Sequence, residues 1–144
     1  MDEKGSLSVL MPVLFASEAE DLIKAAKGYF KSPLEVILLH VIDPRVKDSL
    51  SLLGDNDVEK HFRELKTNTE SSLNEISEKF QCQAMVVEGI PFLEITKVAK
   101  DLNVDVILMK IRSPHQSLKI ETLFFGSTSE RVIRTTSIPV FCLP

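Results

Sequence analysis

The chain alternates short apolar segments with longer amphipathic segments, and this alternation limits the possible folds more than any other feature. Residues 34–42 form the clearest apolar segment, Leu-Glu-Val-Ile-Leu-Leu-His-Val-Ile, and Asp43-Pro44 follows directly. An almost wholly apolar strand is typical of a parallel sheet that helices cover on both faces. We therefore expect residues 34–42 to form a buried central strand.

Apolar runs at residues 7–13, 84–87, 104–109 and 138–143 predict four further strands. The amphipathic segments between them predict helices over residues 17–30, 57–80, 91–102 and 127–135. Connections of helix length are typical of parallel strands joined by right-handed crossovers. The expected fold class is therefore α/β, with one five-stranded parallel sheet and helices on both faces, in a single domain spanning residues 1–144.

Two predicted helices start with the pattern of a capping box, in which a serine and a glutamate three residues later each bind backbone N–H groups of the first turn. One pairs Ser17 with Glu20, and the other pairs Ser127 with Glu130. The second overlaps Gly126-Ser127-Thr128, where the unpaired N–H groups of a helix start are suited to hold a phosphate. Ser127 therefore has two interpretations, a helix cap and an anion site, and both stay open.

The composition argues against several classes of partner. The net charge is −4 and the basic residues form no stripe, which argues against binding to nucleic acid or to an anionic membrane surface. No apolar run has the length of a membrane span, and the polar first residues do not resemble a signal peptide. Cys82 and Cys142 lie far apart and outside any metal-ligand spacing. We expect a cytoplasmic protein without a metal site.

The three histidines offer no catalytic arrangement. His40 lies inside the apolar strand and is expected to be a hydrogen-bonded core or cleft residue, whereas His61 lies among charges on the long helix and is expected to be exposed. Only His115 has a position where it could face a ligand. None of the three pairs with an acid or hydroxyl at a spacing that supports nucleophilic catalysis. We therefore name no catalytic residue.

In a sheet of this kind, ligands bind beyond the carboxyl ends of the strands, where the strand order reverses. The segments that reach this edge are residues 13–16, 41–43, 88–89 and 109–112. The following loop, Lys110-Ile111-Arg112-Ser113-Pro114-His115-Gln116-Ser117, contains no glycine.

Over nearly its full length the chain resembles the universal stress protein family. The resemblance is carried by four segments, in order: Leu38 to Asp43; Val87-Glu88-Gly89-Ile90-Pro91; Ala99 to Met109; and Gly126-Ser127-Thr128-Ser129-Glu130-Arg131-Val132 before Ile138-Pro139-Val140. It implies strand order 3-2-1-4-5 and a homodimer paired through the last strand, here Ile138–Leu143.

The resemblance also implies one of two functional branches. Members of the first bind ATP: an aspartate after the first strand and the backbone of a valine hold adenine, and a loop with two glycines, followed nine residues later by Gly-Ser or Gly-Thr, holds the phosphates. Members of the second lack this pattern and do not bind ATP.

This sequence matches the ATP-binding pattern only in part. Val41 matches the adenine-side valine, Met109 matches the methionine before the phosphate loop, and Gly126-Ser127 with Thr128 matches the last part of the pattern. Leu14 or Phe15 stands where the family has its aspartate, and Ser113 and Gln116 stand where it has the two glycines. Because glycine permits positive φ and close approach of the backbone, its loss narrows the space for a phosphate.

The leading hypothesis is a regulatory binding module, a homodimer with a degenerate nucleotide site that acts through a protein partner and not through turnover. The alternative is an ATP- or AMP-binding switch in which Arg112 and Lys110 replace the glycine loop, since arginine binds phosphate in a bidentate manner, with slow ATP hydrolysis left open. The candidate cofactor-binding residues are Val41, Met109, Arg112, Gly126, Ser127 and Thr128.

Overall fold

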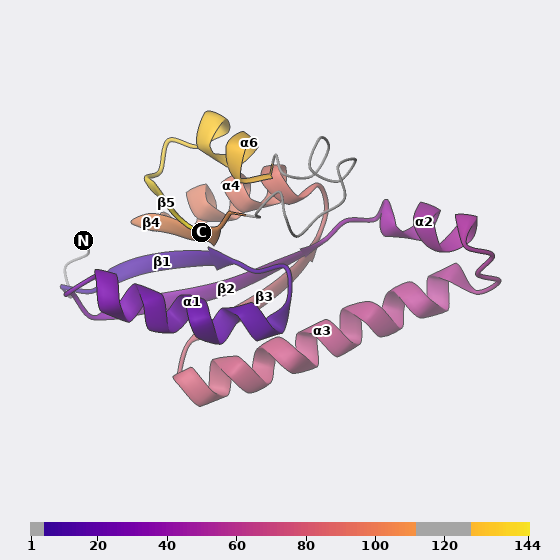
Figure 1. Ribbon diagram of the computed structural model, residues 1–144, viewed down its shortest axis with the longest axis horizontal. Coiled ribbons are helices and arrows are strands. Elements are labelled where there is room, and N and C mark those ends of the chain that lie inside the picture. Colours follow the sequence, from indigo (N-terminus) through magenta and orange to yellow (C-terminus); the bar gives the residue numbers. More distant parts are fainter. Residues whose placement is uncertain (1–4, 112–127) are drawn as a thin grey trace.

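The computed structural model describes residues 5–111 and 128–144 (Figure 1). Its strands are β1 (Leu7–Pro12), β2 (Leu34–Ile42), β3 (Gln83–Glu88), β4 (Val106–Lys110) and β5 (Val140–Leu143). Its helices are α1 (Ala16–Tyr29), α2 (Val46–Leu52), α3 (Val58–Phe80), α4 (Pro91–Asp101) and α6 (Thr128–Thr135). The candidate residues Arg112, Gly126 and Ser127 lie outside the described residues, as do Ser113, His115 and Gln116.

The strands form one parallel sheet in the order β3-β2-β1-β4-β5, which confirms the predicted fold class and strand order. Strand β1 lies at the centre, where Leu10 pairs with Ile37 of β2 and with Ile107 of β4. The strand order reverses at β1, since the chain first adds strands on its β2 side and then on its β4 side.

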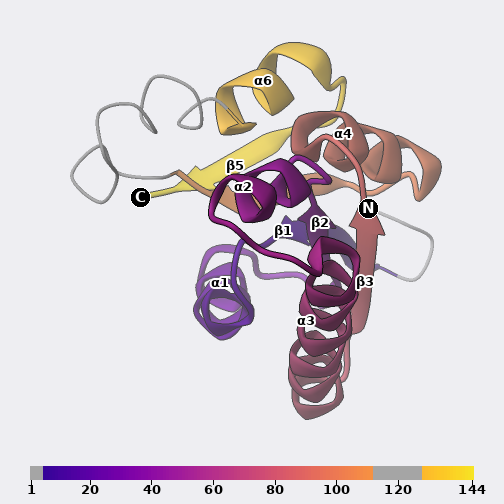
Figure 2. The ribbon, with the colours of Figure 1, turned by 90° about the vertical axis from the view of Figure 1, so that its right-hand side faces the viewer.

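Helices cover both faces of the sheet (Figures 1 and 2). Side chains of a strand alternate between the two faces, so each central strand supplies both cores. Val9, Met11 and Leu38 pack against α1 and α3, and Leu10, Leu39 and Ile107 pack against α4 and α6. All six of these side chains are completely buried. The apolar run at 34–42 is therefore explained by burial on both sides.

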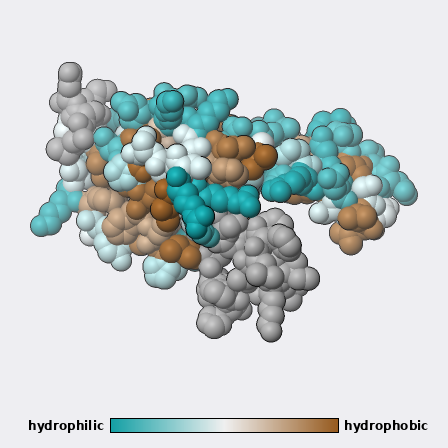
Figure 3. Space-filling view, turned by 90° about the horizontal axis from the view of Figure 1, so that it is seen from above, coloured by the Kyte–Doolittle hydropathy of each residue, from teal (hydrophilic) through white to brown (hydrophobic). Residues whose placement is uncertain are grey.

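No helix is predicted between residues 43 and 57, but α2 lies there. Its apolar residues Val46, Leu50 and Leu53 recur at helical spacing, but the segment is short and none of them is buried. Leu52 and Leu53 are 89% and 85% exposed, and Figure 3 shows apolar atoms on the surface at the α2 end of the molecule. The helix is held to α3 by Lys47, whose Nζ lies 3.3 Å from Glu59 Oε2 and 4.6 Å from the Phe62 ring centroid.

None of the described helices is long and apolar enough to cross a bilayer.

The predicted capping box at Ser17 is wrong. Helix α1 begins at Ala16 with Phe15 as N-cap, and Glu18, not Glu20, makes the contact at the helix start: its Oε1 accepts the Leu14 N–H at 2.6 Å. Glu20 lies further along the helix and pairs with Lys24 and Lys79. The local pattern gave the correct region, but the helix begins earlier than a Ser17 cap would require, and with Phe15 as N-cap the third helical residue is Glu18 and not Glu20.

His61 is exposed, as predicted, and interacts with Asp55 at the start of α3. Its Nδ1 lies 2.6 Å from Asp55 Oδ2, and Asp55 Oδ1 accepts the Asp57 N–H at 2.8 Å. The hydrogen bond and charge of Asp55 raise the pKa of His61 above its usual value. The Asp57 N–H and the His61 ring in turn lower the pKa of Asp55.

We expect Asp55→Asn to lower the pKa of His61 clearly, and Asp57→Asn to lower it much less, because Asp57 acts only through its more distant charge. A histidine whose pKa is raised by folding stabilises the folded state below the unfolded pKa, and this contribution is lost as the pH rises through the folded pKa. Titration of the His61 ring resonances by NMR in the three proteins measures the effect. Equal shifts in the two variants would contradict the assigned contact.

Candidate functional site

The ligand edge lies at the carboxyl ends of the strands, where the segments after β1, β2, β3 and β4 leave the sheet. Val13 follows β1, Asp43 follows β2, Gly89 follows β3 and Ile111 follows β4. The strand-order reversal at β1 prevents the segments on its two sides from closing over one another, which is why such an edge is open to ligands.

The side chains of Val41 and Met109 do not face a ligand. Met109 is 5% exposed and belongs to the apolar cluster between the sheet and helices α4 and α6, and Val41 packs against the same cluster. The structure therefore places these two predicted site residues on the same face of the sheet, but as packing residues. The packing covers the Met109 side chain almost completely, whereas the Val41 side chain stays half-buried.

The backbone of Val41 is available at this edge because β1 ends before β2. Leu39 accepts the Val13 N–H at 2.8 Å, so its carbonyl points toward β1, while Ile42 accepts the Gly89 N–H at 3.0 Å and points toward β3. Peptide groups of successive strand residues point to opposite sides, so the N–H and C=O of Val41 point to the β1 side, like those of Leu39. At that position β1 has already ended at Pro12.

His40 binds the backbone just after β1, next to the peptide groups of Val41. Its Nδ1 donates a hydrogen bond to the Val13 carbonyl oxygen at 2.9 Å, so that the carbonyl is bound by the ring at the point where the β1 backbone turns away. The prediction that His40 is a hydrogen-bonded core or cleft residue is confirmed, since the ring is half-buried. His40 therefore fixes the end of β1.

Position 14 has no carboxylate that could reach a ligand. Leu14 and Phe15 are 50% and 60% exposed at the turn between β1 and α1. The nearest acid in this turn, Glu18, is buried and accepts the Leu14 N–H. The turn thus presents two apolar side chains to solvent at the position where the family has its aspartate.

Asp43 lies at the end of β2, but Arg45 occupies its carboxylate. Arg45 Nε lies 3.0 Å from Oδ1 and 2.8 Å from Oδ2, and the Arg45 N–H donates to Oδ1 at 2.9 Å. Burial raises the pKa of Asp43, but the hydrogen bonds from Arg45 outweigh this effect and the pKa lies below its usual value. Asp43 is therefore an ionised, paired residue and a poor general base.

Thr128 is the one predicted site residue of the last segment that the structure describes. It is half-buried and begins α6. Further along this helix, Glu130 pairs with Arg134 at 2.7 Å, and Arg131 lies 5.3 Å from the ring centroid of Phe92 on α4. Because Gly126 and Ser127 lie outside the described residues, their assignment as an anion site stays a prediction.

The ionisable side chains in the described part of the edge bind other groups of the protein. Each of the ionisable side chains named above is held by the protein: His40 by a carbonyl, Glu18 by a backbone N–H and Asp43 by Arg45. Among the described residues there is also no group of three side chains that could hold a metal ion. What remains open to a ligand is the peptide edge of Val41.

Sequence reasoning found this edge but missed two of its contacts, those of His40 with Val13 and of Arg45 with Asp43. The first depends on the register between β1 and β2, which no local pattern encodes. The second had a usable signal, since an aspartate side chain often accepts a hydrogen bond from the backbone N–H two residues later.

Gly89 shapes the turn between β3 and α4 at this edge. Its φ is 157°, which side chains rarely allow, and a Cβ built there would lie 2.5 Å from Cγ and 2.7 Å from Oε1 of Glu94. By contrast, Gly28 near the end of α1 has an ordinary helical backbone, with nothing within 4 Å of its would-be Cβ.

We expect Gly89→Ala to destabilise the fold by about 1–3 kcal/mol, because the backbone strain remains even if Glu94 moves. Gly28→Ala should instead stabilise it by about 0.5–1 kcal/mol, since alanine favours a helix. Urea unfolding gives both values. Adding Glu94→Ala to Gly89→Ala should restore only the stability lost to the clash with Glu94. Full recovery of the wild-type stability in the double variant would show that the backbone of residue 89 is not strained.

Comparison with known proteins agrees with this geometry. The sequence model described as the Universal stress protein family matches residues 7–144. The chain is 35% identical to universal stress protein MJ0577 of Methanocaldococcus jannaschii over 150 aligned positions, which cover 92% of this chain and 91% of that protein.

Solved structures give the same result. A structure of MJ0577 superposes with a TM-score of 0.67 at 31% identity, and a structure of the hypothetical protein PH0823 superposes with a TM-score of 0.64 at 31% identity. Each comparison covers 95% of this chain and 94% of the other. With the family match over residues 7–144 and the shared strand order, this chain belongs to the universal stress protein family.

Proposed function

We propose that this protein is a regulatory binding module of the stress response, a homodimer whose nucleotide site keeps the base-binding backbone but does not bind ATP tightly. The observation that carries the proposal is the turn after β1, where Leu14 is 50% exposed in place of a carboxylate and the one nearby acid, Glu18, is buried against the Leu14 N–H. In this proposal the protein acts through contacts with a protein partner.

The retained part of the site is the peptide edge of Val41. An N–H and a C=O side by side on the open edge of a sheet can pair with the acceptor and donor of a planar base such as adenine. The lost part is the set of groups that would hold the ribose and phosphates. The sequence has no glycine from Lys110 to Phe125, so a phosphate loop with close backbone approach is not encoded there.

The alternative is an ATP- or AMP-binding switch. It would use Gly126, Ser127 and Thr128 at the start of α6 together with Arg112 and Lys110 in place of the glycine loop. Solved universal stress proteins include one in complex with cAMP and one from Archaeoglobus fulgidus in complex with dAMP, at 15% and 19% identity to this chain. At that identity they share the fold, and their ligands are the natural probes for a test.

Isothermal titration with ATP, AMP and dAMP separates the two proposals. For the degenerate site, we expect dissociation constants weaker than about 100 μM in the wild type. Leu14→Asp should strengthen adenine-nucleotide binding about tenfold, because a charge-assisted hydrogen bond contributes roughly 1.5–3 kcal/mol. Phe15→Asp tests the other residue that matches the family's aspartate. Leu102→Asp is the control and should show no gain, because Leu102 is 44% exposed before β4, at the opposite end of the sheet. Micromolar binding of Mg-ATP by the wild type would favour the switch.

The proposed dimer forms through β5. This strand lies at one edge of the sheet, and its sequence, Val-Phe-Cys-Leu, carries no charge, whereas the opposite edge strand β3 ends in Glu88. The carbonyl of Pro139 accepts the N–H of Ile107 in β4, and the carbonyl of Leu143 accepts the N–H of Ile111, directly after β4. Peptide groups of successive strand residues point to opposite sides, so those of Val140 and Cys142 point away from β4, toward a second copy in the proposed dimer.

Cys142→Pro tests this edge, because it removes one outward N–H without removing a hydrogen bond to β4. We expect Cys142→Pro to be a monomer and Cys142→Thr, which keeps the N–H, to remain a dimer like the wild type. Light scattering coupled to gel filtration measures the mass, and circular dichroism verifies the fold of each variant. A monomeric wild type, or a Cys142→Pro protein that stays dimeric, would contradict pairing through β5.

A further inference from the structure

The outer edge of β3 lacks the features that usually keep an edge strand from pairing with other chains. Among the described strands, β3 lies at the end of the sheet opposite β5, and Figure 2 shows α3 beside it. It pairs with β2 in a continuous register without a bulge. Its central residues 84–87 are half-buried and include no charge and no proline, the residues that usually protect such an edge. This edge is therefore suited to accept an added strand.

The peptide groups of two residues point outward from this edge. Ile42 of β2 accepts the Gly89 N–H at 3.0 Å, so the Gly89 peptide groups point toward β2. Peptide groups of successive strand residues point to opposite sides, so those of Val86 and Ala84, each an odd number of residues earlier, point away from the sheet. Each of these two residues can form two hydrogen bonds with an added strand.

A hollow of about 320 Å³ lies beside this edge, between β3 and α3. Its lining residues are Ala84 and Val86 of the strand and Glu70, Leu73 and Asn74 of the helix. Leu73 is completely buried, so the polar groups of Glu70 and Asn74 form the exposed lining on the helix side. Paired residues of neighbouring strands face the same side of a sheet, so a side chain opposite Val86 would point into the hollow.

The hollow is acidic. Glu70 is exposed, and its carboxylate forms no ion pair or side-chain hydrogen bond within the described part of the chain. Lys66, one turn earlier on α3, binds Glu88 instead, with its Nζ 3.3 Å from Oε1. Asn74, one turn later, adds an amide oxygen that accepts hydrogen bonds. A carboxylate and an amide oxygen together favour a positively charged side chain.

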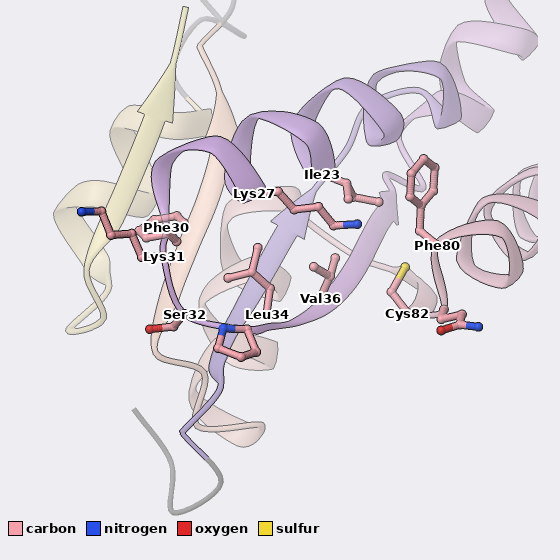
Figure 4. A pocket seen from close by; sticks show the side chains of 11 residues that line it. Ile23, Lys27, Phe30, Lys31, Ser32, Leu34, Val36, Phe80 and Cys82 are labelled. Atoms are coloured by element: carbon pink, nitrogen blue, oxygen red, sulfur yellow. The ribbon is translucent and has the colours of Figure 1, made fainter.

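A larger hollow, of about 500 Å³, has the opposite charge. It lies where α1 and α3 end, and Figure 4 shows Lys27 and Lys31 among its lining residues, none of which is an aspartate or glutamate. A cationic segment is therefore attracted to the hollow beside β3 and repelled at the ends of α1 and α3.

A second copy of this chain fits the β3 edge less well than a cationic segment does. In a symmetric antiparallel pair centred on Val86, Glu88 of one copy would oppose Ala84 of the other. Both Glu70 carboxylates would then lie on the same side of the sheet, close to the symmetry axis. Like charges in such a position oppose pairing, so the charge of the hollow favours a different, cationic partner.

We propose that β3 binds an extended segment of a partner protein that carries a lysine or an arginine. The segment pairs with the outward peptide groups of Ala84 and Val86, and its cationic side chain enters the hollow and binds Glu70. Backbone hydrogen bonds supply affinity, and the charge supplies specificity. The inference rests on the proposed function, since it names the site and the chemistry of the protein partner, but it involves neither the nucleotide site nor β5.

The probe is the peptide acetyl-Thr-Val-Lys-Val-Thr-amide, whose β-branched residues favour an extended chain. Protein labelled with nitrogen-15 is titrated with the peptide, and its amide resonances are followed by NMR. We expect the amides of Ala84 and Val86 to shift, with a dissociation constant of about 1 mM or below. The same peptide with glutamine in place of lysine should bind about three- to fivefold more weakly, as expected for the loss of a partly screened ion pair.

N-methylation of the probe tests the strand pairing. Alternate peptide nitrogens of an added strand face β3, and the others face solvent. The probe is therefore methylated on one alternate set of nitrogens or on the other. We expect one set to abolish binding and the other to leave it nearly unchanged. An equal effect of the two sets would overturn the proposed pairing.

Glu70→Gln tests the charge of the hollow. It should weaken binding of the lysine probe about threefold or more and leave binding of the glutamine probe unchanged, because only the lysine pairs with Glu70. Glu75→Gln is the matched control, since Glu75 is also exposed on α3 but does not line the hollow. It should bind both probes like the wild type. Thermal unfolding shows whether each variant is folded.

Three outcomes would each overturn the β3 site: no shift of its amides with either probe, equal binding of the lysine and glutamine probes, or unchanged binding by folded Glu70→Gln. Shifts at Val13 and Val41 instead would place the partner at the ligand edge, which would overturn the β3 site and not the proposed function. The nucleotide titration and the mass of Cys142→Pro test the proposed function separately.

Discussion

Burial of strands β1 and β2 on both faces is the constraint on which the rest of this structure depends. Leu10, Leu38 and Leu39 are completely buried, and each such side chain contributes about 1.5–3 kcal/mol by leaving water. A strand that is apolar on both faces needs helices above and below it, and helices between strands make the strands parallel. All strands then end at the same edge, which is why the turns after β1, β2 and β3 meet there.

At that edge the protein uses its ionisable side chains to hold its own backbone. His40 binds the Val13 carbonyl, Glu18 binds the Leu14 N–H and Asp43 is paired with Arg45. These contacts rigidify the turns but leave few polar groups for a ligand, apart from the peptide edge of Val41.

Much of this could be predicted from particular residues. The run at 34–42 predicted a central strand with the bounds that β2 has, and Pro91 predicted the start of α4. Two local predictions failed for physical reasons. The pattern Ser17 to Glu20 gave the wrong cap, because the helix begins earlier, with Phe15 as N-cap, and Glu18 is then the third helical residue. Helix α2 was missed although Val46, Leu50 and Leu53 recur at helical spacing, because so short a segment gives a weak periodic signal.

The sequence by itself determined the α/β class and the order of strands and helices along the chain, because burial on one or two faces imposes a periodicity on each segment. Its motifs, and not this periodicity, carried the resemblance to the family. It also determined that position 14 carries leucine and that the loop after β4 has no glycine. Only the tertiary structure decided that the Val41 side chain packs against the core while its peptide groups point to the side where β1 has ended, and that His40 binds the backbone at the end of β1. Those features depend on the register of neighbouring strands, and such contacts between distant segments leave no local pattern.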